Sequence, residues 1–181
     1  MKITKKEIAF QGEYLKVKRS HFEAKNGTKG VWEHTEKTPI PFVVVFALTK
    51  DKEVILERNW RIPSEDWVLE LPSGLNDEEG ESEAQAAKRE LLEETGYRAE
   101  KVIPVFRCLY NPAGTKEEAS YYFAPDVVFA GPSKGDGVEE IEILKVPLAE
   151  LVEFIYEESK TAKVCERILA VIPILQLKGL I

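Results

Sequence analysis

The sequence predicts an α+β fold, a mixed α/β/α sandwich with a small β-strand subdomain at its N-terminus. Short segments along most of the chain alternate polar and apolar residues as strands do, whereas residues 82–95 repeat their apolar positions with helical spacing. Two further helical segments end the chain, and strands flanked by helices in this way are typical of a mixed sheet covered by helices. We expect the N-terminal subdomain over 1–36 and a larger domain over 37–181.

The strands follow from runs of apolar and β-branched residues that turn residues separate. Asn26-Gly27 lies between the first two runs and favours a hairpin turn, whereas Pro39 and Pro41 interrupt the pattern after them. Strands are expected at 14–18, 30–34, 42–48, 53–58, 67–71, 102–108, 120–129 and 140–146.

The clearest helix is expected over 82–95. Ser82 and Gln85 have the spacing of a capping box, in which each side chain satisfies a free backbone N–H of the first turn. Gly96 stands where a glycine commonly ends a helix. The apolar face is predicted from Ala84, Ala87, Leu91 and Leu92. The two helices that close the chain are expected at 147–158 and 162–177.

Composition excludes several classes of protein. The 181 residues carry a net charge of −7 with 44% apolar residues, which argues against a surface that coats nucleic acid. No apolar run is long enough to span a bilayer, and the first residues lack the apolar core of a signal peptide. Cys108 and Cys165 are isolated, as in a reducing compartment. We therefore expect a cytoplasmic protein that binds neither nucleic acid nor membrane.

Glu90, Glu93 and Glu94 are spaced so that one helical turn stacks three carboxylates on one side. Carboxylates at this spacing repel one another, so a cation is expected among them. A solvated acidic face paired with Lys88 and Arg89 is one explanation. A bound Mg²⁺ is the other, because Mg²⁺ prefers oxygen ligands and bridges protein to phosphates.

The residues around this helix resemble the signature of the Nudix hydrolase family. Upstream of it lie Glu70-Leu71-Pro72-Ser73-Gly74 and then Glu81, and the helix itself carries the run Arg89-Glu90-Leu91-Leu92-Glu93-Glu94-Thr95-Gly96. Glu81 and Arg89 have the family's seven-residue gap. One departure occurs, because six residues rather than five separate Gly74 from Glu81.

The resemblance implies a Nudix fold, with 37–181 as the catalytic domain, and a Mg²⁺-dependent hydrolase of diphosphates, with Mn²⁺ as an alternative ion. The metal ligands would be the backbone carbonyl of Ser73 or Gly74 together with carboxylates. Arg89 would orient the glutamates, and Glu81 would hold Arg89. Such a metal lowers the pKa of a bound water, which then attacks phosphorus. The carboxylates concerned are Glu90, Glu93, Glu94 and Glu139.

The general base is left open by the sequence. The family places it on a loop before a late strand, here 134–142. Glu139 matches a further metal ligand, and Glu140 or Asp136 are candidates for the base, as is a metal-bound hydroxide. The position that often carries the base corresponds to Gly137, which has no side chain to serve.

Three further features are similar to the ADP-ribose pyrophosphatase branch of the family. Pro112 lies sixteen residues after Gly96 and opens a loop similar to the branch's substrate loop. Arg58-Asn59-Trp60-Arg61 is similar to a branch motif whose arginines would meet phosphates. In that branch the N-terminal β segment is exchanged across a homodimer and supplies rings that sandwich adenine. The substrate-binding residues implied are Tyr14, Trp32, Glu33, Arg58, Arg61, Pro112, Gly114, Thr115 and Glu117.

The resemblance therefore predicts that ADP-ribose, or a related nucleoside diphosphate sugar, is hydrolysed to AMP and a sugar phosphate. The nearest alternative is another nucleoside diphosphate derivative, such as GDP-mannose or a dinucleotide. A non-catalytic nucleotide-binding regulator would usually have lost the box glutamates, and an isoprenoid diphosphate isomerase would need a cysteine in a recognisable context. His21 and His34 are assigned no role, and no zinc motif is present.

Overall fold

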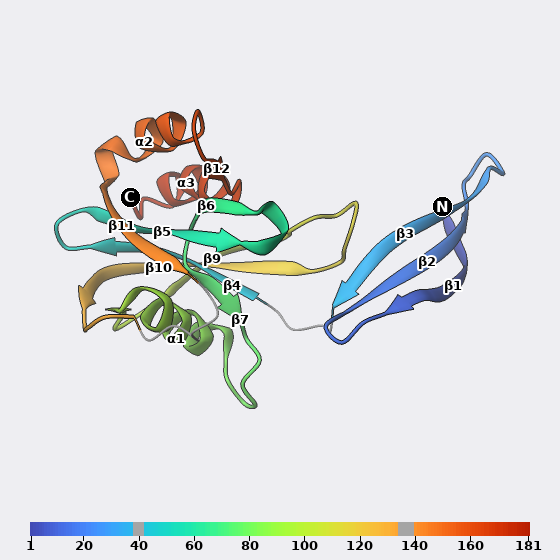
Figure 1. The fold of residues 1–181 in the computed structure, drawn as a ribbon, viewed down its shortest axis with the longest axis horizontal. Helices are drawn as coiled ribbons and strands as arrows, with labels where there is room; N and C mark the ends of the chain where they lie inside the picture. The colour runs from blue at the N-terminus through green and yellow to red at the C-terminus, as the bar shows by residue number, and fades with distance from the viewer. Residues whose placement is uncertain (38–41, 134–139) are drawn as a thin grey trace. The chain divides into compact units, whose positions relative to one another are not determined.

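The computed structural model describes residues 1–37, 42–133 and 140–181, which fall into two compact units (Figure 1). The first unit comprises Met1–Pro41 and Arg107–Ala119, and the second comprises Phe42–Phe106 and Ser120–Ile181. The first unit adds the segment 107–119 to the N-terminal subdomain that the sequence outlines. The boundary after residue 36 stays a prediction.

The first unit is built on a three-stranded antiparallel sheet in the order β1-β2-β3. The hairpin predicted at Asn26-Gly27 is confirmed: Gly27 has a φ of 83°, and the Asn26 side chain accepts a hydrogen bond from the N–H of Thr28 at 3.1 Å. In this hairpin, which joins the second and third strands, Ser20 pairs with Trp32. The first strand was not predicted. The strands are β1 (Lys2–Gln11), β2 (Leu15–Glu23) and β3 (Lys29–Lys37).

The second unit is organised by a larger sheet in which β12-β6-β5-β4-β10-β8 are neighbours, with β11 on β5, β7 on β4 and β9 on β10. Every strand predicted in this part of the chain is present, with ends that differ by a few residues. The strands are β4 (Phe42–Thr49), β5 (Glu53–Arg61), β6 (Asp66–Glu70), β7 (Ser73–Leu75), β8 (Tyr97–Arg98), β9 (Ile103–Leu109), β10 (Glu118–Phe129), β11 (Ile141–Pro147) and β12 (Lys163–Val164).

Helix α1 (Glu83–Thr95) packs on one face of this sheet, with the capping box of Ser82 and Gln85 formed and Gly96 left-handed at φ 74°. Its apolar side contacts β4 in a core of fully buried residues. Leu92 was assigned to that side, which is wrong, because it is 40% exposed while Glu94 is buried. The core residues are Val43, Val45, Ala47, Ile55, Ala86, Ala87, Leu91 and Ala124.

Helices α2 (Leu151–Glu158) and α3 (Arg167–Leu177) lie on the opposite face of the sheet from α1 (Figure 1). Short 3₁₀ turns, η1 (Ile62–Ser64) and η2 (Leu148–Glu150), precede β6 and α2. The expectation of a helix from residue 162 is wrong at its start, since β12 pairs in parallel with β6 before α3 begins. This arrangement confirms the α+β class. None of the helices in the described ranges combines the length and apolar character that a membrane span requires.

Candidate active site

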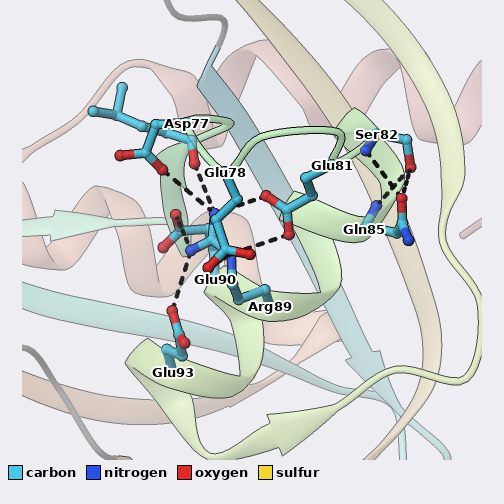
Figure 2. A network of polar contacts seen from close by, with 9 residues as sticks. Asp77, Glu78, Glu81, Ser82, Gln85, Arg89, Glu90 and Glu93 are labelled. Carbon is cyan, nitrogen blue, oxygen red and sulfur yellow. Dashed lines mark hydrogen bonds and ion pairs between the residues drawn. The ribbon is translucent and has the colours of Figure 1, made fainter.

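Arg89, on the second turn of α1, is the centre of the polar network at the start of the helix (Figure 2). Its Nε and Nη2 donate to the two carboxylate oxygens of Glu81 at 3.1 and 3.0 Å. Nη1 donates to Glu90 at 2.8 Å and to Glu93 at 3.2 Å, and Nη2 also donates to the carbonyl of Leu75 at 2.9 Å. The hydrogen bonds to Glu81 raise the pKa of the guanidinium, which therefore stays charged. The geometry agrees with the predicted pairing of Arg89 with Glu81.

Glu90 is packed against the backbone of β7. A Cβ at Gly74 would overlap the carboxyl group of Glu90, so any larger residue there would displace that carboxyl group. The Glu90 side chain is 13% exposed, and burial raises its pKa although Arg89 opposes the shift. Burial of an ionised carboxylate costs free energy unless a cation offsets its charge. Arg89 contacts only one of the two carboxylate oxygens of Glu90.

Glu94 and Glu93 point to different surroundings. Glu94 is buried and accepts a hydrogen bond from the backbone N–H of Ser73 at 2.8 Å. Glu93 is half exposed and contacts Arg89. Glu90 and Glu94 therefore both face the β7 segment, Glu90 through Gly74 and Glu94 through Ser73, while Glu93 faces solvent.

The donors in this region suit a hard divalent cation, since they are carboxylates and backbone carbonyls. The cradle that Gly74 leaves for the buried Glu90 agrees with this donor set. In the described ranges no three acidic, histidine or cysteine side chains already stand close enough to enclose an ion. Glu139, one of the expected ligands, lies outside the described residues.

The raised pKa of Glu90 leads to a prediction for the metal-free protein. A carboxyl group whose pKa is raised on folding stabilises the fold below its ordinary pKa, and this stability is lost as the pH rises through the raised value. In the variant Glu90→Gln that loss is absent. The free energy of unfolding of the variant, relative to the natural protein, should therefore increase from pH 4 to pH 7.

Urea unfolding in a chelator at a series of pH values measures this difference. Glu100→Gln is the control, because Glu100 is 81% exposed in its ion pair with Arg98. A relative stability of Glu90→Gln that stays flat or falls with pH would contradict the burial of an ionised Glu90.

The two arginines predicted to meet phosphates leave β5 on opposite faces. Arg58 donates through Nη2 to both oxygens of Glu158 on α2 at 2.8 Å. Arg61 donates through Nε to Glu70 at 2.7 Å and through Nη2 to its second oxygen at 3.3 Å. Glu70 is nearly completely buried. In this structure Arg61 thus neutralises a buried carboxylate next to the Ser73 segment, and Arg58 joins the sheet to α2.

Within the first unit, Trp32 meets the loop that Pro112 opens. The indole N–H of Trp32 donates to the carbonyl of Ala113 at 2.8 Å. The backbone N–H of Thr35 donates to the carbonyl of Gly114, also at 2.8 Å. Trp32 and the loop residues Pro112, Ala113 and Thr115 form part of the wall of a mainly apolar hollow of about 440 Å³. Its lining residues are Met1, Ile3, Ser20, Phe22, Trp32, His34, Pro112, Ala113, Thr115 and Lys116.

The other predicted substrate residues of the first unit do not line this hollow. Glu33 points to the face of β3 opposite Trp32 and accepts from Arg19 at 2.7 Å. Tyr14 is 79% exposed in the β1–β2 turn and does not line the hollow. Glu117 has one carboxylate oxygen buried without a hydrogen-bond partner in the described part of the chain. Gly114 closes the loop by donating its N–H to the carbonyl of Asn111 at 3.0 Å.

Glu140 is exposed just before β11, and its backbone carbonyl accepts from the N–H of Trp60 at 3.1 Å. The other acids of that loop, Asp136 and Glu139, fall outside the described residues.

Sequence reasoning missed several residues that the structure brings to these sites. The motif that resembles the Nudix signature includes Glu70 without giving it a role, and Arg167, which contacts Glu70, belongs to no motif. Ser20 and His34 are hydrogen-bonded at 3.0 Å on the wall of the hollow. Residues 20, 22, 32 and 34 are two apart along their strands, and this alternation is the signal that places their side chains on one face.

Comparison with known proteins identifies the same family as the motif around α1. The model of the NUDIX domain matches residues 37–167. ADP-ribose pyrophosphatase of Bacillus subtilis is 30% identical over 83% of this chain and 80% of its own length. GDP-mannose pyrophosphatase of Cronobacter sakazakii is 29% identical over 78% of this chain and 70% of its own. A solved structure described as an ADP compounds hydrolase shares the fold, with a TM-score of 0.84 at 24% identity over 98% of this chain and 94% of that one.

The chain belongs to the Nudix family, and the expected Nudix fold is confirmed. It is a pyrophosphohydrolase, an enzyme that cleaves phosphoric anhydrides. Hydrolases of this family generally need a divalent metal ion, which agrees with the oxygen donors around Glu90 and Glu94.

Proposed function

We propose that this enzyme is a Mg²⁺-dependent ADP-sugar pyrophosphatase, which hydrolyses ADP-ribose to AMP and ribose 5-phosphate. The observation that carries the choice of substrate is the hollow of the first unit, where Trp32, Pro112 and Thr115 come together although about eighty residues separate Trp32 from the other two. A mostly apolar hollow with an exposed indole suits a flat base. The name of the relative from Bacillus subtilis, ADP-ribose pyrophosphatase, supports an adenine nucleotide.

In this proposal the diphosphate is cleaved at the acidic helix. Glu90, Glu93, Glu94 and the Ser73 carbonyl would hold Mg²⁺, with Glu139 as a further ligand. When bound, the metal neutralises the diphosphate and lowers the pKa of a water. The protein's own part is to fix these oxygens: Glu81 holds Arg89, Arg89 sets the orientation of Glu90, and the Ser73 N–H holds Glu94.

The remaining assignments belong to the same proposal. Glu140, Asp136 or a metal-bound hydroxide is the candidate for the base. Arg58, Arg61, Gly114 and Glu117 are candidates for contacts with the phosphates and sugar. Tyr14 and Glu33 would contact the base across a homodimer. The enzyme would be cytoplasmic, with no nucleic-acid partner. The net charge of −7 argues against a nucleic-acid partner. The exposed apolar residues of β1 support a dimer, which would cover them. Full activity of a monomer, measured by light scattering and turnover together, would contradict the dimer.

A substrate panel tests the function directly. With Mg²⁺ present, ADP-ribose should give AMP and ribose 5-phosphate by mass spectrometry, and a chelator should stop the reaction. The name of the Cronobacter relative makes GDP-mannose the rival substrate, and its exclusive hydrolysis would overturn the proposal. Absence of turnover on every diphosphate would instead favour a nucleotide-binding regulator.

The same panel applied to Trp32→Ala examines the hollow. Stacking a base on an aromatic ring is worth about 1–3 kcal/mol, so the KM for ADP-ribose should rise roughly 5- to 150-fold with little change in kcat. Tyr156→Ala is the matched control, because Tyr156 is similarly exposed but does not line the hollow. Equal KM values for both variants and the natural enzyme would remove Trp32 from the substrate site.

A further inference from the structure

Arg167, the first residue of α3, connects that helix to the segment between β6 and β7. Its Nη2 donates to Glu70 at 3.3 Å, its Nη1 to the hydroxyl oxygen of Ser73 at 3.3 Å, and its Nε to the sulfur of Cys165 at 3.0 Å. The side chains of Arg167 and Glu70 are 19% and 4% exposed. An arginine from the C-terminal part of the chain therefore contacts Ser73, which is a candidate metal ligand.

The position of this arginine is unfavourable for α3 itself. The N-terminal end of a helix carries partial positive charge, and the first turn of α3 has no acidic residue to offset a cation. Burial of a guanidinium adds a desolvation cost that only good partners repay. Two of the partners of Arg167, Glu70 and Ser73, lie at the ends of β6 and β7, and the third, Cys165, precedes the helix. Its contacts therefore serve the β6–β7 segment as well as the start of α3.

Ser73 is held from two sides. Its hydroxyl oxygen accepts from Arg167, and its backbone N–H donates to Glu94 at 2.8 Å. The residue before it is also fixed, because the carbonyl of Pro72 accepts from the N–H of Val45 at 2.9 Å. The N–H and the carbonyl of Ser73 flank the same Cα, so a displacement of that Cα would shift the carbonyl and disturb the hydrogen bond to Glu94.

We propose that Arg167 is a positioning residue for the metal site: by anchoring Ser73 and the buried Glu70, it fixes the spacing between the Ser73 carbonyl and Glu94. This inference rests on the proposed function, since it takes Ser73 and Glu94 as metal ligands. Outer partners of this kind commonly change metal affinity by about ten- to hundredfold when they are removed.

A purely structural role, in which Arg167 only fastens α3 to the sheet, makes a different prediction. Helix α3 already buries Ile168, Val171, Ile172 and Leu175. The change Arg167→Met keeps a long apolar stem but removes every hydrogen bond, together with the contact of the guanidinium with the Phe42 ring. A structural role would then lower only the melting temperature, whereas a positioning role would change Ser73 and the metal.

The test measures Mn²⁺ binding by electron paramagnetic resonance and the exchange rate of the Ser73 amide proton by NMR in the metal-free protein. In Arg167→Met we expect the Kd for Mn²⁺ to rise about tenfold and the Ser73 amide to exchange about tenfold faster. Arg167→Lys should recover part of both effects. Arg98→Met, which removes an exposed arginine of the same unit, should match the natural protein in both measurements.

Ser73→Ala keeps the test decisive if Arg167→Met does not fold, because it removes only the hydroxyl acceptor. We expect it to speed exchange of the residue-73 amide and to weaken Mn²⁺ binding in the same direction. Unchanged exchange and Mn²⁺ affinity in the variants, with normal binding by the natural protein, would overturn the role of Arg167. If the natural protein bound Mn²⁺ no better than Glu94→Gln, the metal site of the proposed function would fail instead.

Discussion

Replacement of Glu94 by glutamine should abolish most turnover while the fold is retained. The carboxylate of Glu94 accepts the N–H of Ser73, and the oxygen of a glutamine amide can accept the same hydrogen bond. The variant therefore keeps the contact that holds β7 to α1 and loses only the negative charge. If that charge binds the metal, kcat should fall by at least about a hundredfold, the upper end of what loss of an outer partner costs.

The measurement is steady-state hydrolysis of ADP-ribose at saturating Mg²⁺, with circular dichroism to confirm the fold. Glu100→Gln is the charge-matched control on the exposed surface of the same unit, and it should keep the natural rate. If Glu94→Gln kept a rate within a few-fold of the natural enzyme, Glu94 could not be a metal ligand, and the site would need another carboxylate.

The start and end of α1 could be predicted from the sequence because their causes are local. Ser82, Gln85 and Gly96 act within one turn of their own helix, so spacing alone reveals them. The interior of the helix is different. Hydropathy places Leu92 inside and Glu94 outside, whereas the structure does the reverse, because Glu94 has a backbone donor on β7 that belongs to the tertiary fold.

Strand β1 was missed for a related reason. Its side chains are exposed on nearly every position, so the alternation of apolar and polar residues that marks a half-buried strand is absent. β7, β8 and β12 have only three, two and two residues, which is too short for any periodic pattern. These strands are defined by their pairing with β4, β10 and β6 rather than by their own sequence.

The residues of the candidate site likewise fall into a group that a local motif predicts and a group that only the tertiary fold brings together. Glu81, Arg89 and the helix glutamates lie within one motif, and the resemblance identified them together. The contact of Arg167 with Glu70 joins residues 97 positions apart and belongs to no pattern in the chain. The hollow of the first unit could be predicted only in part. The resemblance identified Trp32 and Pro112, whereas the hydrogen bond between Ser20 and His34 follows from the pairing of β2 with β3, which the sequence does not show.

Replacement of Arg89 by methionine should cause the largest loss of stability. In the described part of the chain, Arg89 is the only cationic side chain hydrogen-bonded to Glu81, Glu90 or Glu93, and the side chains of Glu81 and Glu90 are 9% and 13% exposed. Removal of one partner from a buried ion pair leaves an uncompensated charge and costs about 3 kcal/mol or more. For a chain of this length that lowers the melting temperature by roughly 6–12 °C.

Thermal unfolding in a chelator measures the effect, so that an added metal ion does not replace the guanidinium charge. Arg89→Lys should recover only part of the stability, because an ammonium group lacks the planar fork that meets both oxygens of Glu81. Arg98→Met, which opens an exposed pair, should change the melting temperature little.

The double variant Arg89→Met with Glu81→Gln separates the buried charge from the lost packing. If the cost of Arg89→Met comes from leaving Glu81 unpaired, neutralising Glu81 should restore part of the lost stability, and the two changes will not add. Strict additivity would mean that Arg89 stabilises the fold through its other contacts, with Glu90, Glu93 and the Leu75 carbonyl, rather than through Glu81. Recovery of stability without recovery of turnover would show that the same arginine has two separable roles, since the hydrogen bond by which Arg89 orients Glu90 is absent from the double variant.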